Sequence, residues 1–170
     1  MYLALKGDDL SRIKSYSDAD WAGSIVDRKS TSGFICYLGS APLHWATKKQ
    51  NCVSASSFES EYIALSHAAR ETALMKRRAE SIMELAIPAE VLCDNQAAET
   101  VAKGGDGYVS RGAKHIDLRY HIVREMVSNN TISVKRVCTG ENTADTFTKP
   151  LSKIQFTYHR SRLPVLSREC

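Results

Sequence analysis

Long apolar runs are missing from this sequence of 170 residues, and their absence argues against a membrane span and a secretion signal. The longest stretch without a charged residue, residues 30–47, contains glycines, a proline and a histidine, which is typical of a β-hairpin. Nine glycines and four prolines are too few for a collagen-like or low-complexity chain. We therefore expect an intracellular globular protein with no membrane contact.

The number of cysteines and the net charge are also small. The five cysteines are an odd number and include no Cys-x-x-Cys pair, which argues against a zinc ribbon and a disulfide framework. We expect free thiols in a reducing compartment. A formal net charge of +4 permits a nucleic-acid partner without requiring one. The length predicts one domain that buries enough surface to fold unaided.

The signatures of several enzyme classes are absent as well. No glycine-rich phosphate loop follows a predicted strand, and no serine has a credible histidine and aspartate pair. His115 and His121 lie six residues apart, on opposite faces of a helix, so they cannot bind one metal ion. The acidic residues are the remaining candidates for chemistry.

The hydrophobic pattern changes its period near residue 55. Before it, short runs of strand-forming residues predict an antiparallel meander, and after it a period of three to four residues predicts a long helix ended by Ile87-Pro88. The expected strands are residues 16–22, 33–38, 43–46 with 51–54, 91–93 and 132–137, and the expected helices are residues 57–85, 95–102, 116–127 and 141–148.

The order of these elements predicts an α/β fold. An antiparallel meander is joined to parallel strands through helical crossovers, which gives a mixed sheet. We expect residues 1–151 to form this domain and residues 152–170 to form a basic, irregular tail.

Four acidic residues stand at the ends of the predicted elements. Asp18 lies on the first strand, and Asp94 ends a later strand, where open α/β sheets place their ligands. Glu61 begins the long helix on its apolar side, about 160° around the helix from Glu59, which we expect to face water. Asp145 lies in the last short helix.

Four carboxylates that converge on one point repel each other, so they would not all stay ionised without cations. Oxygen ligands without histidine or cysteine favour Mg²⁺ or Mn²⁺ over zinc. Two such ions roughly 3.5–4 Å apart suit an in-line displacement at phosphorus. On spacing alone, the alternative is that these residues are solvated surface acids and helix caps.

Seven segments, in this order, resemble the ribonuclease H domain of copia-type retrotransposons. They cover about residues 15–151, and the ordered series is much more specific than any one member. The segments are Ser-Asp-Ala-Asp-Trp-Ala-Gly (17–23), Asp-Arg-Lys-Ser-Thr-Ser-Gly-Phe (27–34), Trp-Ala-Thr-Lys-Lys-Gln (45–50), Ser-Ser-Phe-Glu-Ser-Glu-Tyr-Ile-Ala-Leu (56–65), Cys-Asp-Asn-Gln-Ala-Ala (93–98), Lys-His-Ile-Asp-Leu-Arg-Tyr-His (114–121) and Thr-Ala-Asp-Thr-Phe-Thr-Lys-Pro-Leu (143–151).

The resemblance implies the ribonuclease H fold, with a five-stranded mixed sheet and helices on its faces. It also implies an endonuclease that cuts the RNA strand of an RNA/DNA hybrid with two Mg²⁺ ions, which Mn²⁺ can replace, and leaves 3′-hydroxyl and 5′-phosphate ends. In such elements the domain ends the reverse transcriptase polyprotein, in a cytoplasmic virus-like particle or the nucleus. Matched position by position, the catalytic and metal-binding acids are Asp18, Glu61, Asp94 and Asp145.

Cellular ribonucleases H often have a histidine before the last acid that helps product release. Residues 138–142 contain none, so we consider His115 for this catalytic role. Two alternatives to the enzyme stay open: a nucleic-acid-binding module with weak or no turnover, and a structural remnant that stabilises a neighbouring polymerase. Basic residues in turns and loops are predicted phosphate contacts, namely Arg28, Lys29, Lys48, Lys49, Arg111 and Lys114.

Overall fold

A five-stranded sheet forms the centre of the protein in the computed structural model, which describes residues 2–3, 10–84, 86–105, 114–163 and 165–166. The strands lie in the order β4-β3-β2-β5-β6. Two further short strands, β1 and β7, pair antiparallel near the two ends of the chain. The strand bounds are β1 Tyr2–Leu3, β2 Ile13–Asp20, β3 Thr31–Leu38, β4 Ala41–Lys49, β5 Ala89–Cys93, β6 Ser133–Arg136 and β7 Val165–Leu166.

The sheet is mixed, as predicted. β2, β3 and β4 form an antiparallel meander, whereas β5 pairs parallel with β2 and β6 pairs parallel with β5. Parallel neighbours need a long crossover between them, and the helix after β4 supplies it. The predicted α/β fold is therefore confirmed.

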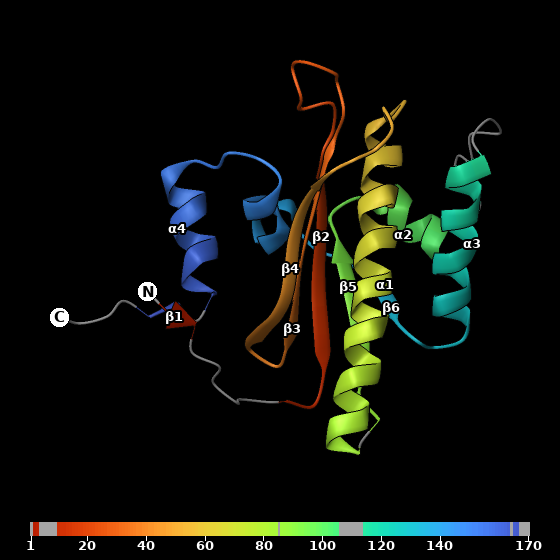
Figure 1. The fold of residues 1–170 in the computed structure, drawn as a ribbon, viewed down its shortest axis with the longest axis vertical. Coiled ribbons are helices and arrows are strands. Elements are labelled where there is room, and N and C mark those ends of the chain that lie inside the picture. The colour runs from red at the N-terminus through yellow and green to blue at the C-terminus, as the bar shows by residue number, and fades with distance from the viewer. Residues whose placement is uncertain (1, 4–9, 85, 106–113, 164, 167–170) are drawn as a thin grey trace.

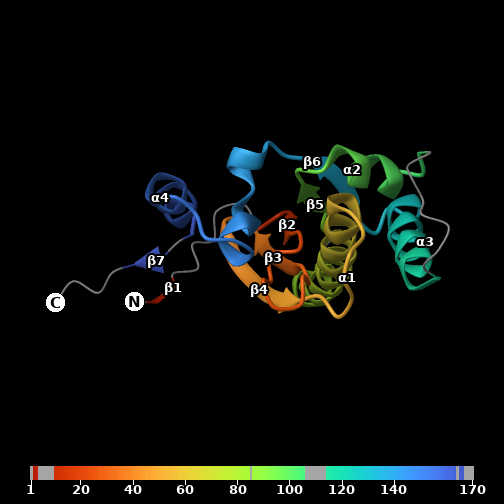
Figure 2. The ribbon, with the colours of Figure 1, turned by 90° about the horizontal axis from the view of Figure 1, so that it is seen from above.

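Helices cover both faces of the sheet (Figures 1 and 2). One side carries α1 (Ser57–Met83), α2 (Gln96–Ala102) and α3 (Lys114–Ser128). The other side carries the 3₁₀ turns η1 (Thr139–Glu141) and η2 (Thr143–Phe147), followed by the helix α4 (Lys153–Ser161). Of the described helices, none combines the length and the apolar character that a membrane crossing requires.

The core lies between α1 and the sheet. Small residues on the inner face of α1, such as Ala68 and Ala69, let the helix approach the strands closely. Larger side chains from β2, β3 and β5 fill the remaining space, and burying each one stabilises the fold by about 1.5–3 kcal/mol. The main members are Ile13, Phe34, Tyr62, Leu65, Val91, Val123 and Val134.

Three local expectations are wrong. Residues 51–54 form no strand, and β4 instead extends through residues 41–49. The short helix expected at residues 141–148 consists of the two 3₁₀ turns η1 and η2. The tail after residue 151, which we expected to be irregular, contains α4, because Ser152 caps the first turn and His159 is buried beneath the helix. A domain boundary at residue 151 remains a prediction.

Candidate active site

Asp18 and Asp94 lie at the same edge of the sheet. The parallel strands β2 and β5 pair Tyr16 with Leu92, and each acid follows its partner residue by two positions. Because side chains alternate along a strand, a shift of two residues keeps both acids on one face. Asp18 is only 1% exposed, and Asp94 is half-buried.

Asp145 reaches this edge from η2, which packs against β2 and β3. The buried Asn142 side chain fixes the turn, since its amide donates to the carbonyl of Ser17 at 3.0 Å and its oxygen accepts from the Ala144 amide. At the far end of η2, Thr47 on β4 donates to the Phe147 carbonyl at 2.8 Å. These contacts place Asp145 over β2.

A glycine on β3 makes the close approach of η2 possible. Gly33 pairs with Asp18 across the antiparallel ladder. A Cβ added at Gly33 would lie 2.7 Å from Thr148 and 2.8 Å from Phe147, well inside contact distance. Any side chain at this position would therefore push η2, and Asp145 with it, away from Asp18.

Carboxylate oxygens of Asp18, Asp94 and Asp145 all lie within 4.8 Å of one another. Within the described part of the chain, they form the one group of three such side chains with the spacing to hold a metal ion. We call them the acid cluster. Hard oxygen donors of this kind suit Mg²⁺ or Mn²⁺.

Glu61 stands beside the acid cluster and outside the group of three. It lies in the second turn of α1 and accepts a hydrogen bond from the backbone of Ala19. Its Oε2 atom is buried and has no hydrogen-bond partner among the described residues. Glu59 has a different environment, since its Oε2 atom accepts from the Ala55 amide at 2.8 Å and helps Ser56 to cap the helix. Glu59 is thus a half-buried capping residue, where we expected a solvated one.

The electrostatics of the site favour protonated acids. Burial, together with the charges of Asp18 and Asp94, raises the pKa of Glu61 to about 9. Burial and the charge of Asp18 raise the pKa of Asp145 to about 7. Shifts of this size arise when acids are buried and, in addition, share a site with like charges and too few cations.

Lys149 supplies part of the missing positive charge. Its Nζ atom lies 3.1 Å from Asp145 Oδ1 and 3.5 Å from Asp18 Oδ2. The Asp145 Oδ1 atom nonetheless receives no well-aligned hydrogen bond from any described residue. Thr148, the neighbouring residue, donates from its hydroxyl to Asp18 Oδ2. One ammonium and one hydroxyl therefore contact the carboxylates of Asp18 and Asp145.

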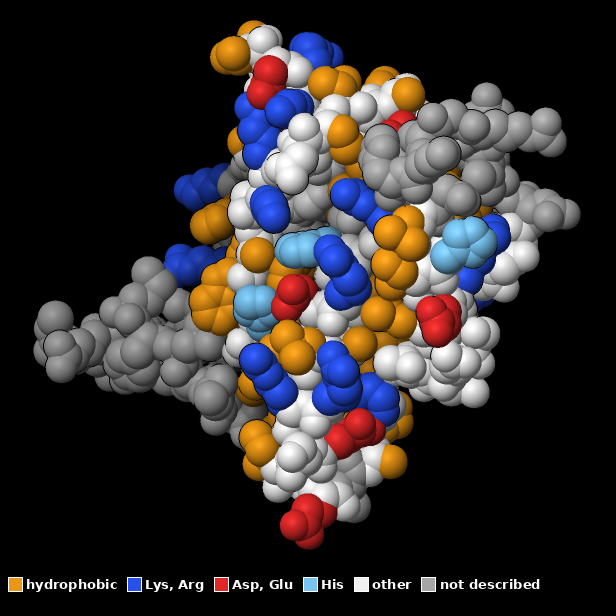
Figure 3. Space-filling view, turned by 45° about the vertical axis from the view of Figure 1, so that its right-hand side comes forward, with side chains coloured by type: hydrophobic (Ala, Val, Ile, Leu, Met, Phe, Trp, Pro, Cys, Tyr) orange, Lys and Arg blue, Asp and Glu red, His pale blue; other side chains and the backbone are white. Residues whose placement is uncertain are grey.

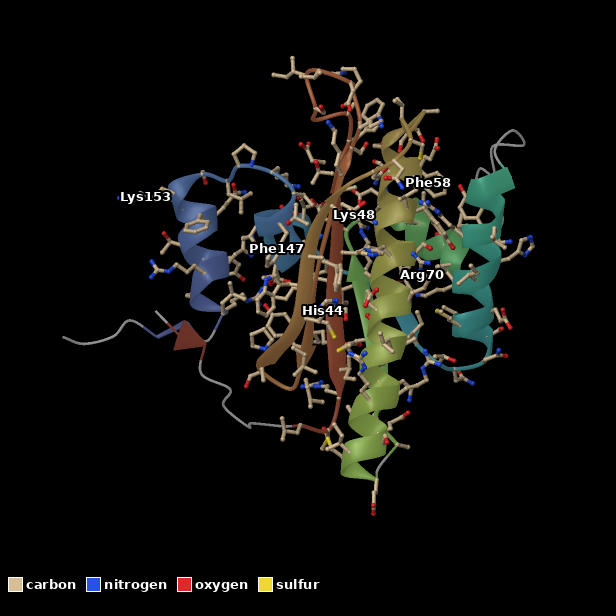
Figure 4. The ribbon with its side chains drawn as sticks, in the orientation of Figure 1. His44, Lys48, Phe58, Arg70, Phe147 and Lys153 are labelled. Carbon is tan, nitrogen blue, oxygen red and sulfur yellow. The ribbon has the colours of Figure 1, made fainter. Side chains whose placement is uncertain are left out.

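A groove with basic walls runs between β4, α1 and α3, on the side of the sheet that faces α1. Lys48 from β4, Arg70 from α1 and Arg119 from α3 line it, together with His67. Figure 4 shows Lys48 and Arg70 on the same side of the molecule, and Figure 3 shows Lys and Arg side chains gathered over this face. We call it the basic groove.

The other predicted phosphate contacts are spread around this edge. Arg28 is exposed in the loop between β2 and β3, and Lys29 next to it is half-buried. Lys49 lines the basic groove, but its Nζ atom pairs with Asp27 at 2.8 Å. Arg111 and the side chains of Lys114 and His115 lie outside the described residues.

Four residues of this region were not predicted from the sequence: Thr148, Lys149, Arg70 and Arg119. The first two had a usable signal, because they lie within the matched segment 143–151 and Lys149 is four residues after Asp145. Arg119 also lies in a matched segment, 114–121, whereas Arg70 lies in none. The meeting of these two residues in one groove depends on how their helices pack, which is a property of the tertiary structure.

No protein-family model matches the chain. It is 39% identical over 162 residues, or 95% of its length, to the retrovirus-related Pol polyprotein from transposon RE2 of Arabidopsis thaliana. It is 40% identical over 164 residues, or 94% of its length, to the corresponding polyprotein from transposon RE1 of the same plant. The chain spans 11% of the length of each polyprotein.

Among solved structures, LC11 ribonuclease H1 in complex with an RNA/DNA hybrid matches with a TM-score of 0.59. The match covers 81% of this chain and 94% of that one, at 13% sequence identity. The structural match identifies the fold, and the sequence matches identify the relatives. The chain therefore belongs to the family of retrovirus-related Pol polyproteins from copia-type transposons, as a part that has the ribonuclease H fold.

Proposed function

We propose that the protein is an endonuclease that hydrolyses the RNA strand of RNA/DNA hybrids during retrotransposon reverse transcription. The observation that carries this proposal is the meeting of Asp18, Asp94 and Asp145 within 4.8 Å, with Glu61 beside them. The likeness to a ribonuclease H1 solved with a hybrid supports the choice of substrate. The products would be a 3′-hydroxyl and a 5′-phosphate.

The residues present fit a pair of Mg²⁺ or Mn²⁺ ions. All donors are carboxylate oxygens, and the Glu61 Oε2 atom is buried without a hydrogen-bond partner among the described residues. Asp18, Glu61, Asp94 and Asp145 would hold the ions. When bound, the ions would supply Lewis-acid activation of the attacking water and stabilise the leaving oxygen.

The chain itself controls the charge of the site. Glu61 and Asp145 must lose their protons to act as anionic ligands, and their raised pKa values make this loss depend on pH near and above neutrality. Lys149 can then exchange its carboxylate partners for a phosphate oxygen of the cut strand. His115 remains our candidate for a proton carrier during product release.

We infer that the basic groove binds phosphates of the DNA strand. Lys48 and Arg70 are exposed and Arg119 is half-buried, so their charged ends are accessible to a ligand. Phosphate contacts carry affinity without sequence information, and 2′-hydroxyls mark the RNA strand in a wide, shallow groove. The protein would therefore recognise its substrate by the shape of the duplex groove and by the 2′-hydroxyls of the RNA strand. A reverse transcriptase domain of the parent polyprotein is the proposed protein partner.

A cleavage assay tests this function directly. An RNA/DNA hybrid labelled on the RNA strand should be cut in Mg²⁺ or Mn²⁺ and left intact in EDTA. Single-stranded RNA and duplex DNA of the same sequence are the matched control substrates. Cutting of duplex DNA at a rate similar to that of the hybrid would contradict the proposal and favour a general nuclease.

One observation favours a second candidate, a module that binds nucleic acid without cutting it. Lys149 already pairs with two acids of the cluster, which lowers their repulsion without a metal ion. The two candidates differ in what Asp145→Asn does. In a nuclease it abolishes cleavage and leaves hybrid binding in EDTA intact, whereas in a binding module there is no cleavage to lose.

A further inference from the structure

The loop between β2 and β3 projects beyond the end of the sheet, at the top of Figure 1, where α1 also begins. Two adjacent apolar side chains in this loop are almost fully exposed, Ile25 at 90% and Val26 at 95%. Single exposed apolar residues are common on protein surfaces, but an adjacent pair on a projecting loop is a different feature. We call this pair the apolar tip.

The apolar tip has a firm support. Lys49 on β4 pairs with Asp27 at 2.8 Å and donates to the Ser24 hydroxyl at 2.9 Å, which ties both sides of the tip to the sheet. At the base of the loop, a Cβ on Gly23 would lie 1.9 Å from the carboxylate of Asp20, so the chain turns tightly there. A ligand-binding element that is already ordered loses little conformational entropy on binding.

Charge and position indicate which ligand the apolar tip meets. Arg28, which is exposed, and Lys29 follow the tip in the same loop, so the surroundings suit a polyanion. Apolar side chains flanked by cations are the devices that many proteins place in the minor groove of a duplex. The loop leaves β2 at Asp20, two residues beyond Asp18, so a duplex bound at the acid cluster lies next to it.

We propose that Ile25 and Val26 contact the minor groove of the hybrid beside the cleavage site and help to fix the duplex over the acid cluster. This inference rests on the proposed function. An A-like duplex has a wide and shallow minor groove, which can accept a pair of aliphatic side chains. The contact is apolar, so its contribution to binding is independent of salt.

The test compares the wild-type chain with the double variant Ile25→Ser/Val26→Ser. Ile82→Ser is the matched control, because Ile82 is also apolar, is 82% exposed and lies near the opposite end of α1. Binding to a fluorescent hybrid is measured in EDTA, where no cleavage interferes. The double variant should bind about tenfold more weakly with an unchanged salt slope, because it loses apolar burial and no phosphate contact. The control variant should bind as the wild type does.

A modified substrate locates the contact. The N2 amino group of guanine lies in the minor groove, so a bulky N2 substituent fills that groove at one base pair. Moved stepwise along the hybrid, it should weaken binding of the wild-type chain at one position and leave the double variant nearly unaffected there. Such coupling between substituent and side chains is the signature of a direct contact.

Two results would overturn the inference. One is equal hybrid affinity of the wild-type chain and the double variant. The other is a dimer of the wild-type chain in sedimentation that the double variant loses while its hybrid affinity is unchanged, because the tip would then be a protein interface. A wild-type chain that binds the hybrid in EDTA but cuts nothing in Mg²⁺ would refute the nuclease and leave the minor-groove contact to the binding data.

Discussion

Two glutamates on α1, Glu80 near its C-terminal end and Glu61 near its N-terminal end, differ in their hydrogen bonds and in the direction of their pKa shifts. Near the C-terminal end, Glu80 Oε1 accepts from Lys76 Nζ at 2.5 Å and from the Ile87 amide at 2.9 Å. These hydrogen bonds, the one from Lys76 above all, lower the pKa of Glu80. Near the N-terminal end, burial raises the pKa of Glu61 to about 9, and its Oε2 atom has no hydrogen-bond partner among the described residues.

This difference in hydrogen bonding indicates that Glu80 stabilises the fold, whereas Glu61 is available to a ligand. Lys76 also donates to the Ile87 carbonyl at 2.8 Å, so Glu80 belongs to a network that fixes the turn after α1. Glu61 instead faces Asp18 and Asp94, and their charges work against its ionisation. A buried acid that is costly to ionise is typical of a functional site, where a bound cation offsets its charge.

The largest expected effect concerns cleavage. Glu61→Gln keeps the size of the side chain and removes its charge, so we expect the single-turnover rate to fall by about 100- to 1000-fold, as for the loss of a preorganised electrostatic contact. The melting temperature of the metal-free protein should rise, because burial and the charges of Asp18 and Asp94 force Glu61 to take up a proton on folding, and glutamine needs none. Glu59→Gln is the matched control, and its rate should stay within about threefold of the wild type. Equal losses in the two variants would show that the assignment of Glu61 is wrong.

Metal ions should stabilise the folded protein through Glu61 and not through Glu80. A ligand that binds only the folded chain stabilises it by about 2.7 kcal/mol at 100 times its dissociation constant. Millimolar Mg²⁺ or Mn²⁺ should therefore raise the melting temperature of the wild-type protein and, much less, that of Glu61→Gln. Glu80→Gln should respond as the wild type does. Scanning calorimetry with and without EDTA measures this, and a wild-type melting temperature that ignores Mn²⁺ would argue against a converged site.

The metal-free protein should lose stability as pH rises. An unfolded glutamate releases its proton near pH 4.5, whereas folded Glu61 holds it up to about pH 9. Between these values the folded state binds more protons, so the free energy of unfolding falls with increasing pH. Urea titrations in EDTA at several pH values should show this slope in the wild type and a reduced one in Glu61→Gln. A slope that is the same in both proteins would mean that Glu61 is not the titrating group.

Much of this arrangement could be read from the sequence. A helical rotation of 100° per residue places Glu59 and Glu61 about 160° apart around α1, and the alternation along a strand predicts which face of the first strand Asp18 occupies. Contacts between distant segments could not be read in this way. Asn142 reaching Ser17, and Arg70 lying across a groove from Lys48, depend on how η2 and α1 pack on the sheet. The helix α4 was not predicted, because its sequence is basic and polar and its one buried side chain, His159, gives no apolar periodicity.

The basic groove should affect binding more than chemistry. If about four phosphates are neutralised, log K should fall with log salt with a slope near −3 to −4. Lys48→Ala combined with Arg70→Ala should flatten this slope by about two and leave cleavage per bound complex nearly intact. Lys153→Ala combined with Arg160→Ala is the control, because it also removes two positive charges and both residues belong to α4, on the opposite side of the molecule (Figure 4). A slope that changes equally in both proteins would assign the effect to net charge and not to the groove.

The smallest effect is expected at the other end of α1. Glu80→Gln weakens the contacts to Lys76 and to the Ile87 amide, so it should lower the melting temperature modestly and leave the cleavage rate unchanged. The pKa of Glu80 is lowered in the folded protein, so its stabilisation is present above the unfolded pKa and is lost as pH falls through the folded one. The deficit of Glu80→Gln should therefore shrink in acid, whereas the gain of Glu61→Gln should grow as pH rises. Melting curves of both variants from acid to neutral pH measure the two signs, and a common sign would mean that the two glutamates do not differ in the way their contacts indicate.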